Sequence, residues 1–267
     1  MRLTVLADNN TYIDMYYLGE PAVSYFIEDG DEKILFDAAY SDAYIRNAKK
    51  MGIDLDTVDM IVLSHGHNDH SGGLSYLTDR KKKYKLISHP GSFVSREDEN
   101  GLYIGAPFDA EKASKLFDLT LTKEAVRISR HLTYLGEIET VFDYESRYSI
   151  GNTIIKGKKE ADQVMDDSAL VYESDKGLFI ITGCSHSGIC NIIEQAKRVC
   201  RNDKIYGVIG GFHLFENDER LRKTIDYLEK QDIKLLYPCH CVSLQAKIEM
   251  GKRLKIREVG VGLRLEL

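Results

Sequence analysis

Residues 65–70, with the sequence His-Gly-His-Asn-Asp-His, constrain this chain more than any other segment. They directly follow the short apolar run at residues 60–63, Met-Ile-Val-Leu, which predicts a buried strand. The cluster is therefore expected in the loop at the C-terminal end of that strand. Three imidazoles and a carboxylate in so short a loop indicate a metal site rather than a surface loop that is His-rich by chance.

The spacing within the cluster predicts how it would bind metal. Residues two apart in an extended segment point the same way, so His65 and His67 can chelate one ion. Asp69 and His70 come just after the bend and are placed to bind a second ion nearby. Imidazole nitrogen and carboxylate oxygen are ligands that zinc, iron and manganese accept.

Composition limits the classes of protein to which this chain can belong. The chain has 267 residues, a net charge of −6 and five cysteines. We expect a single domain over residues 1–267, with a less regular insertion around 89–148 that covers or borders the site. The mixed charge excludes the basic stripe of a nucleic-acid binder, and the basic run at 81–83 predicts a solvated turn.

The same composition predicts where the protein works. No apolar stretch approaches the length of a membrane span, and the N-terminal residues lack the layout of a signal peptide. An odd number of cysteines, mostly in or beside buried elements, suits a reducing cytoplasm. We predict a cytoplasmic protein with a small-molecule substrate and with neither nucleic acid nor membrane as partner. The sequence does not indicate an oligomeric state.

Apolar runs and periodicity along the chain predict alternating strands and helices, the pattern of an α/β protein. The predicted strands cover residues 2–6, 23–27, 33–36, 60–63, 84–87, 169–172, 178–181, 205–209 and 235–237. The predicted helices cover residues 41–51, 110–117 and 189–200, with one more running through 221–228.

Three more histidines, His186, His213 and His240, each follow a predicted apolar strand. Strand ends in layered α/β proteins converge on one edge, where ligands bind. We therefore predict that His186 and His240 are metal ligands. For His213, a metal-ligand role and a substrate contact both stay open, and we assign His213 to the substrate contact. His89 follows a fifth strand, and for it a substrate-pocket role and a structural role are equally open.

The His65-x-His67-x-Asp69-His70 spacing, followed by glycines at 72 and 73, resembles the metal motif of the metallo-β-lactamase superfamily. The run 34–37, Ile-Leu-Phe-Asp, resembles the family's early strand, whose Asp lies beneath the metal loop. The run ending in His240 resembles a later strand whose final His is a ligand. The resemblance thus covers nearly the whole chain. It implies an α/β fold, a four-layer αββα sandwich with a mono- or dinuclear metal site at the edge between its sheets.

The resemblance also implies a chemistry. One ion would be held by His65, His67 and His186, and the other by Asp69, His70 and His240. We expect two zinc ions, with manganese and iron as the other candidates. The implied activity is that of a metal-dependent hydrolase, in which a metal-activated water attacks a carbonyl or phosphoryl centre of a small molecule. Asp69 would be the catalytic residue that orients the water or carries its proton.

The sequence departs from the common family pattern at residues 182–184. Family hydrolases have Thr-Gly-Asp there, and this chain has Thr-Gly-Cys, so the Cys184 thiol replaces a bridging carboxylate. No His lies between His131 and His186 to fill the family's third-ligand position. Asp166 and Asp167, or His186, would have to replace the missing ligands. Cys184 is either a ligand or a small buried residue beside His186, and we favour the second.

Four short motifs resemble one branch of the superfamily, the metal-dependent hydrolases of β-lactamase superfamily II. They are Gly-Cys-Ser-His at 183–186, Gly-Gly-Phe-His at 210–213, Cys-His-Cys at 239–241 and Asp-Asn-Asn at 8–10. Some members carry the name 7,8-dihydropterin-6-methyl-4-(β-D-ribofuranosyl)aminobenzene-5′-phosphate synthase. A transferase of this type, which displaces diphosphate and for which magnesium is a further candidate, is therefore the alternative function.

Two departures weaken the transfer of that substrate identity. The branch has Cys-Thr-Gly where this chain has Cys-Val-Ser at 241–243, and Asp-Thr-Gly where it has Asp-Ala-Ala at 37–39. Asp8, Asn9 and Asn10 follow the first strand and are candidate substrate-binding residues, with a plain Asx turn as the alternative. A third reading is a non-catalytic metal or redox sensor that uses Cys184, Cys239 and Cys241.

Overall fold

The computed structural model describes residues 1–79 and 82–267. Lys81 of the predicted basic turn lies outside the described residues. The chain forms two compact units. Unit 1 comprises residues 1–123, 148–166 and 260–267, and unit 2 comprises residues 124–147 and 167–259. This division does not test whether the chain forms a single domain, so that expectation stays a prediction.

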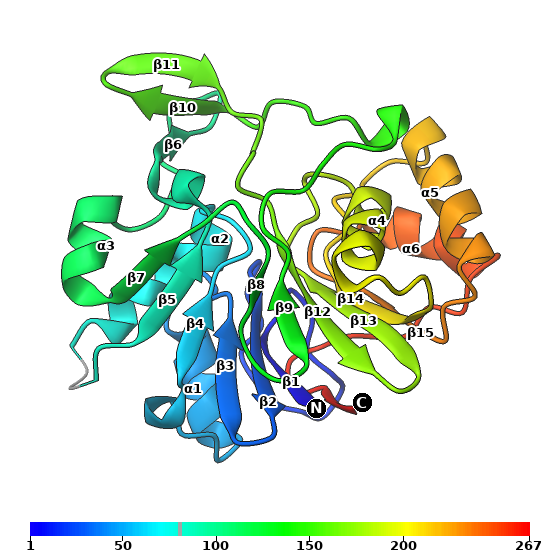
Figure 1. Ribbon diagram of the computed structural model, residues 1–267, viewed down its shortest axis with the longest axis horizontal. Coiled ribbons are helices and arrows are strands. Elements are labelled where there is room, and N and C mark those ends of the chain that lie inside the picture. Colours follow the sequence, from blue (N-terminus) through cyan, green and yellow to red (C-terminus); the bar gives the residue numbers. More distant parts are fainter. Residues whose placement is uncertain (80–81) are drawn as a thin grey trace. The chain divides into compact units, whose positions relative to one another are not determined.

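Unit 1 is built on a seven-stranded sheet with the strand order β16-β1-β2-β3-β4-β5-β7 (Figure 1). The strands from β16 to β3 pair antiparallel, and those from β3 to β7 pair parallel. The strands of this sheet are β1 (Arg2–Ala7), β2 (Ser24–Asp29), β3 (Glu32–Phe36), β4 (Met60–Val62), β5 (Lys85–Ser88), β7 (Asp118–Leu121) and β16 (Arg264–Glu266).

The described part of unit 1 also contains three α-helices and three 3-10 helices. They are α1 (Ala43–Lys50), η1 (Leu55–Thr57), α2 (Asn68–Ser71), η2 (Gly72–Leu77), η3 (Pro90–Phe93) and α3 (Ala110–Leu116). Apolar side chains of α1, η2 and α3 pack on one face of the sheet in a single buried cluster. Tyr44 and Ala48 of α1, at the predicted helical spacing, meet Leu35 and Ile61 of the strands in this cluster.

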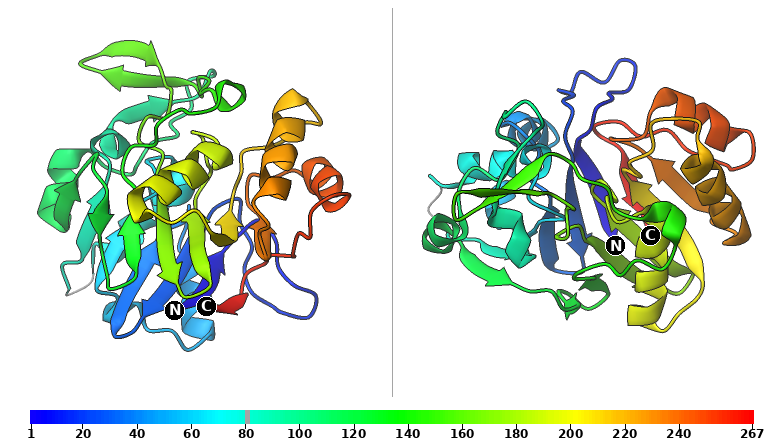
Figure 2. Two further views of the ribbon diagram at one scale, coloured as in Figure 1. Left: turned by 45° about the vertical axis from the view of Figure 1, so that its right-hand side comes forward. Right: turned by 90° about the horizontal axis from the view of Figure 1, so that it is seen from above.

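A small second sheet in unit 1 stands apart from the main one. Its order is β11-β10-β6, with β6 at Ser95–Glu97, β10 at Asn152–Ile155 and β11 at Lys158–Ala161. The β10–β11 hairpin projects away from the seven-stranded sheet (Figure 1). The β1–β2 connection also projects from its sheet, as a long dark-blue loop in Figure 2.

Unit 2 is built on a six-stranded sheet with the strand order β15-β14-β13-β12-β9-β8. The strands β13, β14 and β15 are parallel, and the others pair antiparallel. The elements are β8 (Val126–Arg127), β9 (Leu132–Tyr134), η4 (Asp143–Glu145), β12 (Ala169–Ser174), β13 (Gly177–Thr182), α4 (Ile189–Cys200), β14 (Ile205–Gly210), α5 (Glu219–Lys230), β15 (Leu235–Pro238) and α6 (Leu244–Gly251).

A second buried apolar cluster joins α4, α5 and α6 to the sheet of unit 2. The apolar stripe of α4, which includes Ile189, Ile192 and Ala196, packs there beside Ile180 and Val208 of the strands. Strands and helices appear in both units at nearly all the predicted positions, so the predicted α/β class is confirmed. Among the described residues, no helix has both the length and the apolar character needed to cross a membrane.

The stretch predicted to be a less regular insertion contains η3, β6, α3, β7, β8, β9 and η4. The helix predicted at 110–117 is confirmed as α3. Strand β7 extends the main sheet of unit 1, and β8 and β9 extend the sheet of unit 2. Three strands of this stretch therefore belong to the two main sheets, and the rest of it lies outside them. Its predicted role in covering the site stays a prediction.

Candidate functional site

The loop after β4 brings two imidazoles of unit 1 together, as the sequence predicts. His65 and His67 are both buried, and His65 Nε2 lies 3.0 Å from His67 Nδ1. Two nitrogens bound to one tetrahedral zinc ion at ~2.05 Å each would lie about 3.3 Å apart. The pair therefore has the spacing that chelation of a single ion requires.

His70, in the short helix α2, lies between two carboxylates of unit 1. Its Nδ1 is 2.7 Å from Asp37 Oδ2, and its Nε2 is 3.5 Å from Asp69 Oδ2. Asp37 follows β3 and also accepts hydrogen bonds of 2.7 Å from the backbone nitrogen and the hydroxyl of Ser64. Asp37 thus fixes the orientation of the His70 ring, as an outer carboxylate does for a metal-ligating histidine.

The electrostatics of the two kinds of histidine differ. Burial lowers the pKa of His67 to about 4, and the nearby Arg96 guanidinium adds to this effect. His67 is therefore neutral near pH 7, the state in which imidazole binds metal. Burial also opposes a charge on His70, but Asp69 and Asp37 outweigh burial and raise the pKa of His70 well above its usual value. Binding of a metal ion by His70 would therefore release a proton.

The backbone of the donor loop, residues 65–70, is held by an ion-pair cluster of unit 1. The backbone nitrogen of Gly66 donates to Asp166 Oδ2 at 2.8 Å. Asp166 pairs with the Arg96 guanidinium, whose Nε lies 2.6 Å from Asp162 Oδ2. The Asp166 carboxylate therefore holds the donor loop in this structure. Asp166 was one of the residues considered above as a replacement ligand.

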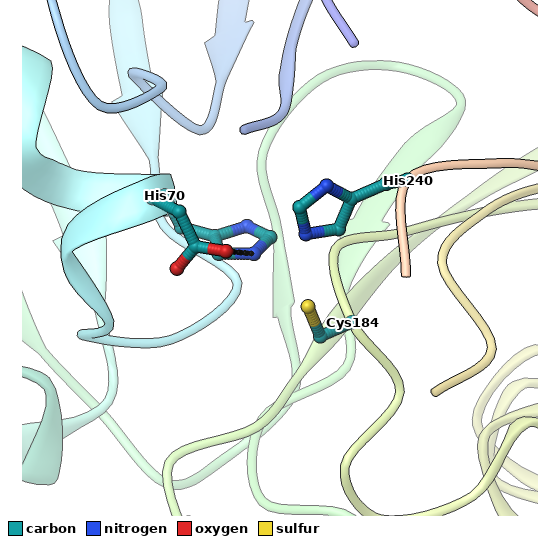
Figure 3. Close-up of side chains that lie close together, drawn as sticks. His70, Cys184 and His240 are labelled. Carbon is teal, nitrogen blue, oxygen red and sulfur yellow. Dashed lines mark ion pairs between the residues drawn. The ribbon is translucent and has the colours of Figure 1, made fainter. Parts of the chain in front are cut away.

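The donors of unit 2 lie at the ends of three parallel strands. Cys184 and His186 follow β13, His213 follows β14, and His240 follows β15. Cys184 Sγ and a ring nitrogen of His240 lie within 4.8 Å of each other (Figure 3). The ring centroids of His186 and His213 are 4.4 Å apart. Unit 2 thus places these residues in two pairs at its strand ends, Cys184 with His240 and His186 with His213.

The backbone at these strand ends adopts an unusual conformation. Ser185, His213 and His240 have φ values of 51°, 52° and 50°, in the left-handed region. Non-glycine residues in this region cost about 1–2 kcal/mol each, and such residues cluster at functional sites. This left-handed conformation turns the chain sharply just after each strand, at or next to the residues that carry the imidazoles.

Hydrogen bonds hold the His186 loop in place within unit 2. Asp167 accepts from the backbone nitrogen of Ser187 at 2.7 Å and also from its hydroxyl. Asn191 Nδ2 donates to the carbonyl of Ser187 at 2.7 Å, and Asn191 Oδ1 accepts from the backbone of Val141. Asp167 therefore anchors the loop that carries His186.

The cysteines of unit 2 pack between its donor loops. The Cys241 thiol accepts from the backbone nitrogen of His213 at 3.3 Å and donates to the carbonyl of Cys184 at 3.4 Å. A Cβ at Gly211 would lie 2.4 Å from Cys241 Sγ, so this glycine permits the close approach of the two loops. The contacts of Cys241 are structural ones that join two strand ends.

The remaining predicted site residues make local contacts in unit 1. Asp8 Oδ1 accepts from the backbone nitrogen of Asn10 at 2.9 Å, which is the Asx turn named as the alternative, and Asn9 is exposed. His89 Nδ1 accepts from the backbone nitrogen of Gly91 at 2.9 Å and caps η3. Substrate contacts by Asp8, Asn9, Asn10 and His89 stay predictions.

Sequence reasoning missed Arg96 and Asp162 in unit 1, and Asn191 in unit 2. Arg96 lies on β6, a strand of three residues without apolar alternation, so no local signal separates it from exposed arginines. Asn191 lies in the first turn of α4, on the side opposite the apolar stripe, where a polar residue would be expected to be exposed. Its position in the helical pattern therefore gave no sign that its side chain is buried.

The donors in each unit are nitrogen, oxygen and sulfur atoms of the types that bind zinc and related transition metals. The donor set therefore fits the metal that the sequence motif implies.

Comparisons with known proteins agree with this chemistry. The family described as Metallo-beta-lactamase superfamily matches residues 18–240. An uncharacterized protein of Methanocaldococcus jannaschii, MJ0448, is 33% identical over 94% of this chain and 94% of its own length. The 7,8-dihydropterin-6-methyl-4-(beta-D-ribofuranosyl)-aminobenzene-5'-phosphate synthase of the same organism is 31% identical over 92% of this chain and 89% of its own.

A solved structure gives the same picture of the fold. The crystal structure of Tm1679, described as a metal-dependent hydrolase of the beta-lactamase superfamily, has a TM-score of 0.87 and 27% identity to this chain. The similarity covers 100% of this chain and 99% of Tm1679. The predicted fold and the predicted family are confirmed, and the chain belongs to the metallo-β-lactamase superfamily.

Proposed function

We propose that this protein is a metal-dependent hydrolase that acts on a carbonyl or phosphoryl centre of a small molecule. The observation that carries the proposal is the buried His65–His67 pair, whose ring nitrogens have the spacing of two ligands on one ion. Following the family motif, His65, His67 and His186 hold one ion, and Asp69, His70 and His240 hold the other. Zinc is the proposed metal, because five of the six proposed donors are imidazoles and the sixth is a carboxylate.

The bound ions would supply Lewis acidity and lower the pKa of water from ~15.7 toward ~7. The protein supplies orientation and proton transfer. Asp37 holds the His70 ring through Nδ1, so Nε2 is the nitrogen presented for binding. The Asp69 carboxylate, at the loop surface of unit 1, accepts the proton of the attacking water and delivers it to the leaving group. His213 contacts the substrate.

Metal analysis combined with activity tests this proposal. Purified protein is stripped with chelator, reloaded separately with zinc, manganese or iron, and analysed for bound metal. Each form is then assayed with a lactone, a thioester and a phosphodiester. We expect close to two equivalents of zinc and metal-dependent hydrolysis of one of these classes. Less than half an equivalent of every metal, with activity unaffected by His67→Ala, would contradict the proposal.

A second candidate is a synthase that displaces diphosphate from a dihydropterin methyl diphosphate. The 31% identity to a protein named as such a synthase, over 92% of this chain, favours it. The same ions would neutralise the leaving diphosphate, and magnesium is then a further candidate metal. Incubation with the pterin diphosphate and the aminobenzene ribotide, followed by measurement of released diphosphate, decides between the two. Release without the ribotide present would indicate hydrolysis.

A further inference from the structure

Arg96 is the largest fully buried side chain among the residues that the structure describes, and it carries a charge. It lies on β6 and is only 2% exposed. Its guanidinium pairs with two buried carboxylates, Asp162 and Asp166, both from the segment that follows β11. A buried charge is tolerated only where partners satisfy it, so this three-residue cluster has a defined geometry.

The cluster is joined directly to the donor loop of unit 1. Asp166 uses one carboxylate oxygen for Arg96 and the other for the backbone nitrogen of Gly66, which lies between His65 and His67. Asp162 differs from Asp166 in this respect, because its second oxygen accepts from the backbone nitrogen of Val164. The two aspartates therefore share Arg96, but only Asp166 contacts the loop that carries the donors.

Packing adds to this hydrogen bond. A Cβ at Gly66 would lie 1.9 Å from the carbonyl oxygen of Ser92 and 2.5 Å from Arg96 Nη1. The backbone of the donor loop is thus pressed against the Arg96 guanidinium and the η3 turn, with no room for a side chain. Together, the contact and the hydrogen bond set the position of the peptide that separates the two chelating histidines.

We propose that Arg96 and Asp166 are positioning residues that hold His65 and His67 at the spacing needed to chelate one metal ion. The inference rests on the proposed metal-dependent function. Asp166 acts on the loop backbone, and Arg96 acts through Asp166 by fixing its carboxylate. Outer residues of this kind typically change metal affinity by about 10- to 100-fold when they are replaced.

The test compares Asp166→Asn with Asp162→Asn, a matched pair in which each variant weakens one ion pair to Arg96. Both proteins are stripped of metal and unfolded in urea, and their zinc affinity is measured by competition with a chromophoric chelator. Cobalt is then bound in place of zinc, and its visible absorption reports the ligand geometry. Arg96→Met is measured alongside them, provided that it folds.

We expect both aspartate variants to lose similar stability without metal, because each disturbs the same buried ion-pair cluster. Asp166→Asn should bind zinc 10- to 100-fold more weakly and give an altered cobalt spectrum. Asp162→Asn should stay within about threefold of the wild-type affinity. Equal effects of the two variants on zinc affinity, or a wild-type affinity and cobalt spectrum for Asp166→Asn, would overturn the inference. A wild-type protein that binds no metal would instead refute the proposed function.

Discussion

The two units of this protein present candidate metal donors in different ways. Unit 1 presents four donors from a single loop of six consecutive residues, 65–70, after one strand. Unit 2 collects its donors from the ends of β13, β14 and β15, which are separated by long stretches of chain. The loop of unit 1 is held by a buried Arg–Asp ion-pair cluster, whereas the strand ends of unit 2 combine a left-handed backbone with hydrogen bonds accepted by Asp167 and donated by Asn191.

This difference has a physical consequence. A loop held by buried ion pairs depends on each partner, because removal of one member leaves an unpaired charge in a site of low dielectric constant. Donors at separate strand ends depend instead on the sheet, whose core is distributed over many apolar side chains. Loss of a support should therefore be more damaging in unit 1 than in unit 2.

The largest expected effect is that of His67→Ala. This change removes one of the two donors that unit 1 places 3.0 Å apart, so the loop loses the chelating pair that holds the first ion. We expect loss of at least one metal equivalent and of all measurable activity, with the fold retained by circular dichroism. His131→Ala is the control, because His131 packs against Tyr172 away from the donor loops of unit 2. Equal metal content in both variants would contradict the assignment.

His240→Ala should have the next largest effect. If His240 is a ligand of the second ion, its loss leaves His65 and His67 to chelate the first. We therefore expect a folded, inactive protein with about half the wild-type metal, measured by elemental analysis. If His240 instead supports a ligand without binding the ion itself, His240→Ala should weaken metal affinity by about 10- to 100-fold, with the full stoichiometry kept at saturating metal. Global unfolding, or full metal with full activity, would show that unit 2 does not supply this donor.

Asp37→Asn should have an intermediate effect confined to the second ion. The amide keeps the shape of the side chain but weakens the hydrogen bond to His70 Nδ1 and removes the nearby charge. Zinc affinity should fall by about 10- to 100-fold, and the pKa of His70, measured by NMR in metal-free protein, should fall as well. An unchanged zinc affinity would mean that the carboxylate is needed only for the Ser64 contacts.

The smallest expected effect is a difference in pH dependence between buried acids of the two units. Burial raises the pKa of Glu145 in unit 2 above its usual 4.5. The folded protein then holds a proton that the unfolded chain has released, so stability falls as pH rises from 4.5 toward the folded pKa. Relative to Glu145→Gln, wild-type stability should decline over this window by about 1.4 kcal/mol for each unit of pKa shift.

Asp166 in unit 1 should show the opposite sign. Burial opposes its ionisation, but Arg96 outweighs burial and lowers the pKa of Asp166 below 3.8. Its stabilising contribution is present above 3.8 and is lost as pH falls through the lower, folded pKa. Urea unfolding of Asp166→Asn and Glu145→Gln between about pH 2 and 7, each compared with the wild-type protein, measures both slopes. Slopes of the same sign would show that the buried acids of the two units are held alike.

Much of the fold could be predicted because the strongest elements carry local signals. The stripe of α4 predicted a helix over 189–200, which are its observed bounds, and the strands predicted at 169–172 and 178–181 are confirmed as β12 and β13. The small sheet could not be predicted in this way. Strand β6 pairs with β10, more than fifty residues away, and neither has the alternation of a half-buried strand.

In the candidate site, too, some residues could be predicted from local sequence signals and others could not. The donors of the 65–70 loop could be predicted because they are contiguous and follow an apolar strand. The strand-end histidines His186, His213 and His240 could be predicted because parallel strands end at one edge. Arg96 could not, because its role depends on carboxylates from distant parts of the chain. The sequence also left the role of Asp166 open, and only its contacts with Arg96 and Gly66 assign it to the support of the loop.

The left-handed residues Ser185, His213 and His240 carry a consequence for how this protein can change over evolutionary time. Glycine adopts this conformation at lower free energy than other residues do. Replacement of any of the three by glycine would therefore raise the stability of the folded protein. Under the proposed function, selection for the side chain opposes that replacement. In a descendant that no longer uses the site, glycine at 213 and 240 would be an early mark of lost function, well before the fold itself diverged.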